Sequence, residues 1–278
     1  MNWWQAIILG IVEGVTEFLP ISSTGHLTII QKLMGMPLDD PSLTAFTAII
    51  QIGAIAAAII YFWSDIWRVL SAWWLGLWRR SERKNFDYKY GWAIILGSVP
   101  IAITGLLFKD EIETVLRSLW FVAFGLIGWS VVMWLADKYG QGKRTEKDTT
   151  WRDTLIIGIV QCMSLIPGVS RSGATISAGL LRGFDRVTVT KLSFFLGIPA
   201  LVAAGILQAA TNYHLVGGGI GWGNTLLAMA VSFVVGYVSI AWLLKFIASN
   251  NFALFIWYRV ILGVLLLGLL SLGVVTAI

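Results

Sequence analysis

Six apolar stretches of this chain are each long enough to cross a lipid bilayer as a helix. A soluble domain can bury one such segment in its core, but not one after another along 278 residues. Hydrophobic residues make up 57% of the chain and charged residues only 13%, outside the usual balance of soluble domains. The sequence therefore predicts an all-α, polytopic membrane protein. The stretches are Leu43–Trp63, Trp92–Phe108, Leu119–Ala136, Leu192–Gln208, Thr225–Phe246 and Phe252–Thr276.

Two further apolar stretches are broken near their middles by a proline. Neither gives an uninterrupted span, so we expect each to enter the membrane and turn back as a re-entrant hairpin. Broken backbone at membrane depth is stable only where protein buries it or where it lines a wet cavity. The pieces are Asn2–Leu19 and His26–Leu33 around Pro20, and Thr154–Ile166 and Gly173–Leu181 around Pro167.

The two hairpins share a sequence pattern, which indicates an internal repeat. Residues 10–13 read Gly-Ile-Val-Glu, and residues 158–161 read Gly-Ile-Val-Gln. A serine-rich turn that begins with proline follows each of them, at residues 20–25 and at residues 167–173, where the second copy carries one extra residue.

We therefore predict a single integral membrane domain, residues 1–278, with one repeat over about 1–148 and the other over about 149–278. Each repeat has one re-entrant hairpin and three transmembrane helices. Because three spans are an odd number, the second repeat must be inverted relative to the first. Inverted repeats place their broken helices together near the bilayer midplane, so the two serine-rich turns are expected to meet.

Basic residues are distributed unevenly between the two sides that this topology predicts. Fifteen lie on one side, and three (Lys32, Lys109 and Arg117) lie on the other. The positive-inside rule assigns the fifteen to the cytoplasm, so both termini and the first hairpin face outward. The net charge of +5 is then a property of the loops and does not indicate nucleic-acid binding. The fifteen are Arg68, Arg79, Arg80, Arg83, Lys84, Lys89, Lys138, Lys143, Arg144, Lys147, Arg152, Arg182, Arg186, Lys191 and Lys245.

Glu13 and Glu17 lie four residues apart in an apolar segment, so a helix places both carboxylates on one face. Two uncompensated anions in a low-dielectric setting imply a cation, a proton or both. Carboxylate oxygens favour a hard divalent cation. One of the two carboxylates is also a candidate proton acceptor. The alternative is a structural ion pair that joins helices.

Ser22, Ser23, Thr24 and His26 follow directly after the acidic pair. A helix cap explains one of the three hydroxyls, but not all of them. We take Ser23 as the first candidate nucleophile with His26 as its general base and later acid, and water activated by His26 or Glu17 as the second.

Arg171 and Arg259 are the two basic residues predicted inside the membrane. A guanidinium at a Pro/Gly turn, beside hydroxyls and the start of a helix, has the donors of a phosphate-binding site. The alternative for Arg171 is an ion pair with Glu13 or Glu17. Arg259 is expected to reach the interface or a lipid headgroup. The hydroxyls near Arg171 are those of Ser170, Ser172 and Thr175.

Two motifs resemble the bacterial undecaprenyl pyrophosphate phosphatase family, which is associated with bacitracin resistance. They are Glu-Gly-Val-Thr-Glu-Phe-Leu-Pro-Ile-Ser-Ser-Thr-Gly-His at 13–26 and Pro-Gly-Val-Ser-Arg-Ser-Gly-Ala-Thr-Ile-Ser at 167–177. The resemblance extends over essentially the whole chain. It implies a phosphatase of the bacterial plasma membrane, dependent on a divalent metal such as Mg or Ca, with its active site open to the outer face.

On this reading the substrate is an isoprenoid pyrophosphate lipid, drawn from among the membrane lipids that surround the protein. The metal at Glu13 and Glu17 is expected to hold the pyrophosphate together with Arg171, and the hydroxyls of Ser22 and Thr24 to assist. The competing class is a secondary transporter or lipid flippase, because inverted repeats with broken helices are typical of transporters. The sequence leaves a homodimer open.

Overall fold

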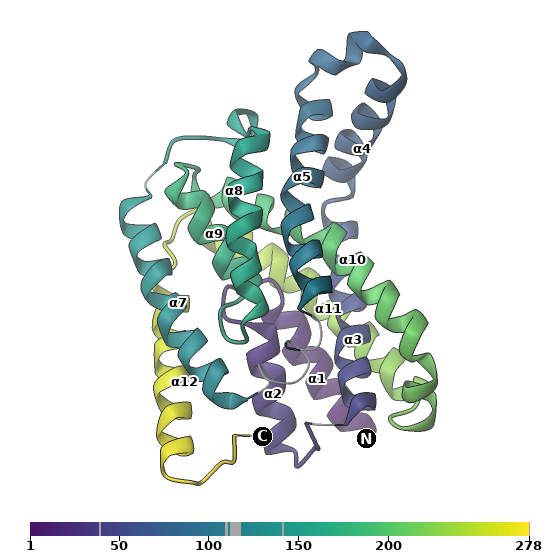
Figure 1. The fold of residues 1–278 in the computed structure, drawn as a ribbon, viewed down its shortest axis with the longest axis vertical. Helices are drawn as coiled ribbons and strands as arrows, with labels where there is room; N and C mark the ends of the chain where they lie inside the picture. Colours follow the sequence, from purple (N-terminus) through teal and green to yellow (C-terminus); the bar gives the residue numbers. More distant parts are fainter. Residues whose placement is uncertain (39, 109–110, 112–117, 141, 278) are drawn as a thin grey trace.

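The computed structural model describes residues 1–38, 40–108, 111, 118–140 and 142–277. Two of the outer basic residues, Lys109 and Arg117, therefore lie outside the described residues. The regular elements of the described part are helices (Figure 1). The α-helices are α1 (Trp3–Thr16), α2 (Ser23–Leu33), α3 (Pro41–Tyr61), α4 (Trp63–Trp78), α5 (Phe86–Leu107), α7 (Leu119–Tyr139), α8 (Trp151–Gln161), α9 (Arg171–Leu181), α10 (Arg186–Gly218), α11 (Trp222–Ile247) and α12 (Ala253–Ser271).

Six of the described helices, namely α3, α5, α7, α10, α11 and α12, are long and apolar enough to cross a membrane. The six predicted spans are thus confirmed, and the chain is a multi-pass membrane protein. Both chain termini lie at one end of the molecule (Figure 1), as an even number of crossings requires. The main difference in length is α10, whose 33 residues continue through Pro199 well beyond the predicted Leu192–Gln208.

Helix α4 was not predicted. Its first half carries Asp65 and Arg68, which interrupt the apolar pattern. Arg68 forms ion pairs with Asp87 of α5 at 3.2 Å and with Glu146 at 2.7 Å, which ties α4 to α5 and to the α7–α8 connection. Figure 1 shows α4 and α5 as a hairpin that projects beyond the other helices at the end opposite the termini.

The two broken stretches form helix–turn–helix units, α1–α2 and α8–α9, which lie toward opposite ends of the molecule (Figure 1). Helix α1 packs against α11, and α8 packs against α5. Helices α3 and α10 contact each other, as do α7 and α12. If the repeats correspond, α1 matches α8, α3 matches α10, α5 matches α11 and α7 matches α12. Each packing pair then maps onto another pair or onto itself, which is consistent with two inverted repeats.

Glycine allows both hairpins to approach their neighbours closely. A Cβ atom on Gly10 would lie 2.6 Å from the carbonyl oxygen of Ala228 on α11. A Cβ atom on Gly158, the matching residue of the second repeat, would overlap the backbone of Gly97 on α5. Such contacts between backbones are typical of helix packing in membranes. The shared Gly-Ile-Val pattern therefore has a packing role in each hairpin.

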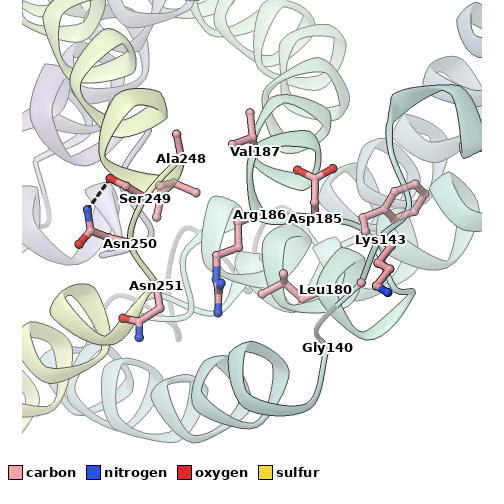
Figure 2. Close-up of a pocket in the computed structure, with 13 residues that line it drawn as sticks. Gly140, Lys143, Leu180, Asp185, Arg186, Val187, Ala248, Ser249, Asn250 and Asn251 are labelled. Atoms are coloured by element: carbon pink, nitrogen blue, oxygen red, sulfur yellow. Dashed lines mark hydrogen bonds between the residues drawn. The ribbon is translucent and has the colours of Figure 1, made fainter.

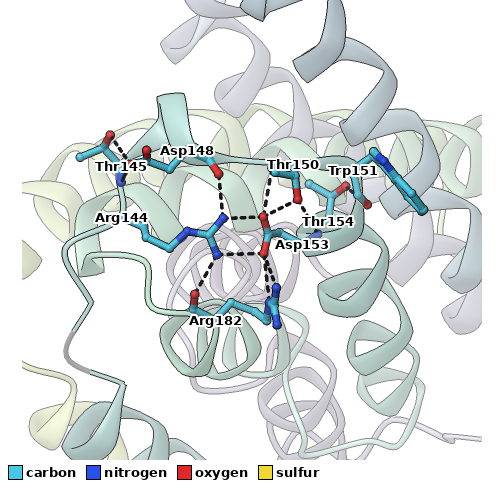
Figure 3. A network of polar contacts seen from close by, with 8 residues as sticks. All are labelled: Arg144, Thr145, Asp148, Thr150, Trp151, Asp153, Thr154 and Arg182. Atoms are coloured by element: carbon cyan, nitrogen blue, oxygen red, sulfur yellow. Dashed lines mark hydrogen bonds and ion pairs between the residues drawn. The ribbon is translucent and has the colours of Figure 1, made fainter.

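A polar network holds the end of the second hairpin that lies away from its turn (Figure 3). Asp153 at the start of α8 is buried and accepts hydrogen bonds from Arg144 at 2.6 and 2.9 Å and from Arg182 at 2.9 and 3.0 Å. The hydrogen bonds to Asp153 raise the pKa of the Arg144 guanidinium above its ordinary value, so this pair stays charged. The network joins the connection before α8 to the end of α9 and fixes how the hairpin enters the protein.

Candidate active site

The two hairpin turns have the same local geometry. Ser22 and Ser170 have φ values of 77° and 76°, a left-handed conformation that non-glycine residues rarely adopt. Each serine caps the following helix: Ser22 Oγ accepts from the backbone N–H of Gly25 at 3.3 Å, and Ser170 Oγ accepts from that of Gly173 at 3.2 Å. The next residues, Ser23 and Arg171, consequently occupy equivalent positions at the start of α2 and α9.

The turns contact each other directly, as predicted from the inverted repeat. The backbone N–H of Gly168 donates to Ser22 Oγ at 3.2 Å. In return, Ser172 Oγ donates to the carbonyl oxygen of Leu19 at 3.0 Å. These reciprocal hydrogen bonds bring the acids of the first repeat to the arginine of the second.

Glu17 is the centre of the polar cluster, and its side chain is only 3% exposed. Its Oε2 accepts from Ser23 Oγ at 2.7 Å and from Gln51 Nε2 at 3.1 Å. Its Oε1 forms an ion pair with Arg171 Nη2 at 3.3 Å. Gln51 on α3 thus supports the carboxylate. The four side chains come from the C-terminal end of α1 and from α2, α3 and α9, so the site depends on the packing of both halves.

The Arg171 side chain is held in place, but not all of its hydrogen-bond donors are used. Its Nη1 donates to the carbonyl oxygen of Ser193 on α10 at 3.0 Å, while its buried Nε–H has no partner in the described part of the chain. The guanidinium lies directly over Gly197, where any side chain would overlap it. A fixed guanidinium with an unused donor is suited to an anionic ligand.

The other residues predicted to bind phosphate are mostly engaged within the protein. Ser170 Oγ lies 3.1 Å from Ser172 Oγ, and Thr175 Oγ1 donates to Ser193 Oγ at 2.6 Å. Thr24, at the first turn of α2, is exposed. The structure brings these hydroxyls to the two turns, and their role as phosphate ligands stays a prediction.

Glu13 fits the predicted cation site. It is buried beside Glu17 and Arg171, and its Oε1 has no hydrogen-bond partner among the described residues. An orphaned carboxylate oxygen next to a second carboxylate is the donor set that a hard cation prefers. The described residues contain no cluster of three or more His, Cys, Asp or Glu side chains, and this part of the chain offers two carboxylates at the site. Magnesium sites of this kind are completed by water and substrate phosphate.

His26 lies at the turn, but among the described residues no hydrogen bond joins it to Ser23; the predicted pairing of the two in the reaction stays a prediction. Its Nδ1 lies 2.7 Å from the carbonyl oxygen of Ser22, and its Nε2 lies 2.6 Å from the hydroxyl of Tyr258 on α12. The hydrogen-bond acceptor of Ser23 Oγ is Glu17 Oε2. Tyr258 was not predicted, since 232 residues separate it from His26.

Arg259 was expected at the membrane interface, and this prediction is wrong: the residue is fully buried. Its Nη1 donates to the carbonyl oxygen of Pro20 at 3.1 Å, and its Nη2 donates to that of Gly168 at 2.9 Å. The same side chain also donates to α7. Its hydrogen-bond partners in the described part of the chain are carbonyls and one hydroxyl. Arg259 thus joins the two turns and adds a positive charge behind them.

We expect the substitution Arg259→Met to destabilise the fold by about 3 kcal/mol or more, because it removes the guanidinium donors that several buried carbonyl oxygens share. The measurement is denaturant unfolding of the purified protein in detergent. Arg152→Met is the matched control, since Arg152 is exposed beside Trp151 and its loss should change stability little. Equal stability of the two variants would contradict the role of Arg259.

A pocket of about 630 Å³ lies elsewhere, where the connections that follow α7, α9 and α11 meet (Figure 2). None of the site residues described above lines it. Arg186 in its wall is already paired with Asp137, at 2.7 Å between Nε and Oδ1. Asp185, another lining residue, caps α10 through its contact with Thr188. Nothing in this lining matches the chemistry at the meeting turns.

The fold and the site together define a multi-pass membrane protein with a buried acid, hydroxyl and arginine cluster where two broken hairpins meet. A family model described as "Bacitracin resistance protein BacA" matches residues 6–265. The chain therefore belongs to the bacitracin resistance protein BacA family.

Curated relatives match the chain over its whole length. Undecaprenyl-diphosphatase 3 of Frankia casuarinae is 59% identical over 277 residues, with 100% of both chains covered. The undecaprenyl-diphosphatase of Cutibacterium acnes is 58% identical over 284 residues, and that of Mycolicibacterium smegmatis is 47% identical over 279 residues, again with 100% of both chains covered.

Proposed function

We propose that this protein hydrolyses undecaprenyl pyrophosphate to undecaprenyl phosphate and inorganic phosphate, and so recycles the lipid carrier of cell-wall synthesis. The names of its full-length relatives support this substrate. The observation that carries the chemistry is the ion pair between Glu17 and Arg171, which joins a candidate proton acceptor to a candidate phosphate ligand inside a membrane protein.

The contacts of the cluster suggest how its residues divide the reaction. Ser23 Oγ attacks the terminal phosphorus while Glu17 takes its proton, because these two groups already share a hydrogen bond of 2.7 Å. Arg171, with its unused Nε–H, stabilises the charge that develops on the phosphoryl oxygens. The lipid phosphate leaves, and water then releases phosphate from Ser23. His26 holds or supplies a proton at Nε2, the ring nitrogen that faces α12.

Glu13 and Glu17 are the residues that would hold a divalent cation, either Mg or Ca. Bound there, the ion would supply positive charge against the phosphate oxygens. The orphaned Oε1 of Glu13 supports this assignment. Without such a cation, two buried carboxylates beside an incoming pyrophosphate would repel it.

The excess of basic residues in one set of loops supports an active site reached from the outer leaflet of the bacterial plasma membrane. The isoprenoid chain would lie between helices in the bilayer, and the pyrophosphate would reach the turns near the midplane. Both turns belong to one chain, so the proposed site needs no side chain from a second copy of the protein.

The test is release of phosphate from undecaprenyl pyrophosphate by the purified protein in detergent. We expect turnover without any membrane gradient, loss of turnover on addition of a chelator, and recovery when Mg or Ca is restored in excess. A transporter or flippase would release no phosphate under these conditions. Turnover that is unchanged by exhaustive chelation would contradict the cation site, while phosphate release itself would still support the phosphatase.

A further inference from the structure

Tyr258 on α12 contacts His26 but has no part in the reaction proposed above. Tyr258 Oη lies 2.6 Å from His26 Nε2, and the two rings are stacked with an interplanar angle of 9° and centroids 5.5 Å apart. We propose that Tyr258 is the positioning residue of His26, which fixes both the tautomer and the orientation of the imidazole. This inference rests on the phosphatase activity proposed above.

The hydrogen bonds determine the tautomer. The carbonyl oxygen of Ser22 can only accept, so His26 Nδ1 must carry the proton that it donates across 2.7 Å. In the neutral imidazole, Nε2 is then the acceptor, and Tyr258 O–H is its donor. When Nε2 takes up a proton, it donates to Tyr258 Oη instead, and the tyrosine proton is free to turn toward a phosphate oxygen. The contact thus persists in both protonation states without movement of the ring.

The position of Tyr258 supports a functional contact rather than simple packing. Arg259, the next residue, joins the two turns, so the backbone of α12 is held in place at Tyr258. Tyr258 itself is 42% exposed on the surface of the helix bundle. It therefore contacts the imidazole and also reaches the surface of the bundle, where a membrane lipid can approach. A tyrosine that only packs in the core would be buried, whereas Tyr258 is partly exposed and hydrogen-bonds a histidine.

The charged groups near His26 are known, so an effect of Tyr258 can be separated from theirs. Glu17 of α1 reaches the same turn through Ser23, and Arg171 of α9 pairs with Glu17. Arg259 of α12 lies close enough to act on His26 electrostatically. On α7, Asp137 contacts Arg186 and the start of α12, away from the turns. The substitution Tyr258→Phe keeps all of these groups and the stacked ring, and removes only the hydroxyl.

We expect Tyr258→Phe to lower kcat about five- to tenfold while KM changes by less than about twofold, because one hydrogen bond to the acid–base group is lost and the phosphate ligands remain. The pH–rate profile should also shift, because the lost hydroxyl contacts Nε2 in both protonation states of the imidazole. Tyr237→Phe is the matched control: Tyr237 is 41% exposed on α11 and makes no hydrogen bond in the described part of the chain. This control should leave kcat and the profile unchanged.

A second measurement does not depend on activity. The chain has only two histidines, so ring-¹⁵N labelling of a His214→Gln protein reports His26 alone. We expect the tautomer protonated at Nδ1, with an Nε2 resonance that shifts when Tyr258 is replaced by phenylalanine. An active wild type in which Tyr258→Phe changes neither kcat, nor the pH profile, nor this resonance would overturn the inference. A wild type that releases no phosphate would instead overturn the proposed function, and the resonance would still decide the contact.

Discussion

Replacing Arg171 with methionine is expected to lower kcat for lipid pyrophosphate hydrolysis by about 10³-fold. The guanidinium is the charged donor that faces the turn from the second repeat, and its Nε–H is unused in the structure. Methionine keeps part of the length but neither charge nor donors, so the developing phosphoryl charge loses its main protein partner. Lysine at this position should recover only part of the rate, because a point charge does not replace a planar fork. The measurement is phosphate release at saturating substrate.

The control for this substitution is Arg186→Met. Arg186 is likewise an arginine held by a single carboxylate, Asp137, but it lies in the wall of the other pocket. Its replacement should leave kcat within about twofold of wild type. Thermal unfolding of each variant in detergent shows whether it is folded. A folded Arg171→Met protein with near-normal kcat would remove the arginine from the chemistry.

The substitution Glu17→Gln is expected to lower kcat by a similar factor of about 10³. Glutamine preserves the shape of the side chain and can still accept a hydrogen bond, but it cannot take the proton of Ser23. It also leaves Arg171 without its counter-ion. The loss should appear in kcat and in the concentration of Mg or Ca needed for half-maximal turnover.

Glu146→Gln provides the comparison for Glu17→Gln. Glu146 also accepts from an arginine, Arg68, at 2.7 Å, but it does so between the α7–α8 connection and the first half of α4, with no contact to the turns among the described residues. It should therefore behave as wild type in turnover and in metal requirement. If Glu17→Gln keeps full activity with an unchanged metal requirement, then Glu17 is only a structural partner of Arg171.

The sequence predicts that the two turns meet, because the residues of each turn belong to one short motif. Apolar stretches interrupted by Pro20 and Pro167 predict the hairpins, and an odd number of spans per repeat predicts that they meet. The reciprocal hydrogen bonds between the turns and the Glu17–Arg171 pair confirm that expectation. Composition and periodicity suffice here because the membrane leaves few alternatives for an apolar segment.

The sequence does not predict contacts that depend on the angle of a helix. Whether Arg259 reaches the interface or the turns is decided by the rotation of α12, which no local pattern reveals. The same rotation places Tyr258 in hydrogen-bond contact with His26, while Ser23 donates its hydrogen bond to Glu17. One signal was present: an arginine inside a span is expected to face protein and to have a role. The neighbouring Trp257 and Tyr258 favoured the interface instead.

The most direct test of the account is an experimental structure of the protein with a lipid bisphosphonate, in which a methylene group replaces the bridging oxygen of the pyrophosphate, in the presence of Ca. We predict that the two phosphonate groups lie at the meeting turns, in contact with Arg171 and within reach of Ser23, with the cation between them and Glu13 and Glu17. Binding of the bisphosphonate elsewhere, such as in the pocket lined by Lys143 and Arg186, with the turns still closed on each other, would contradict the account.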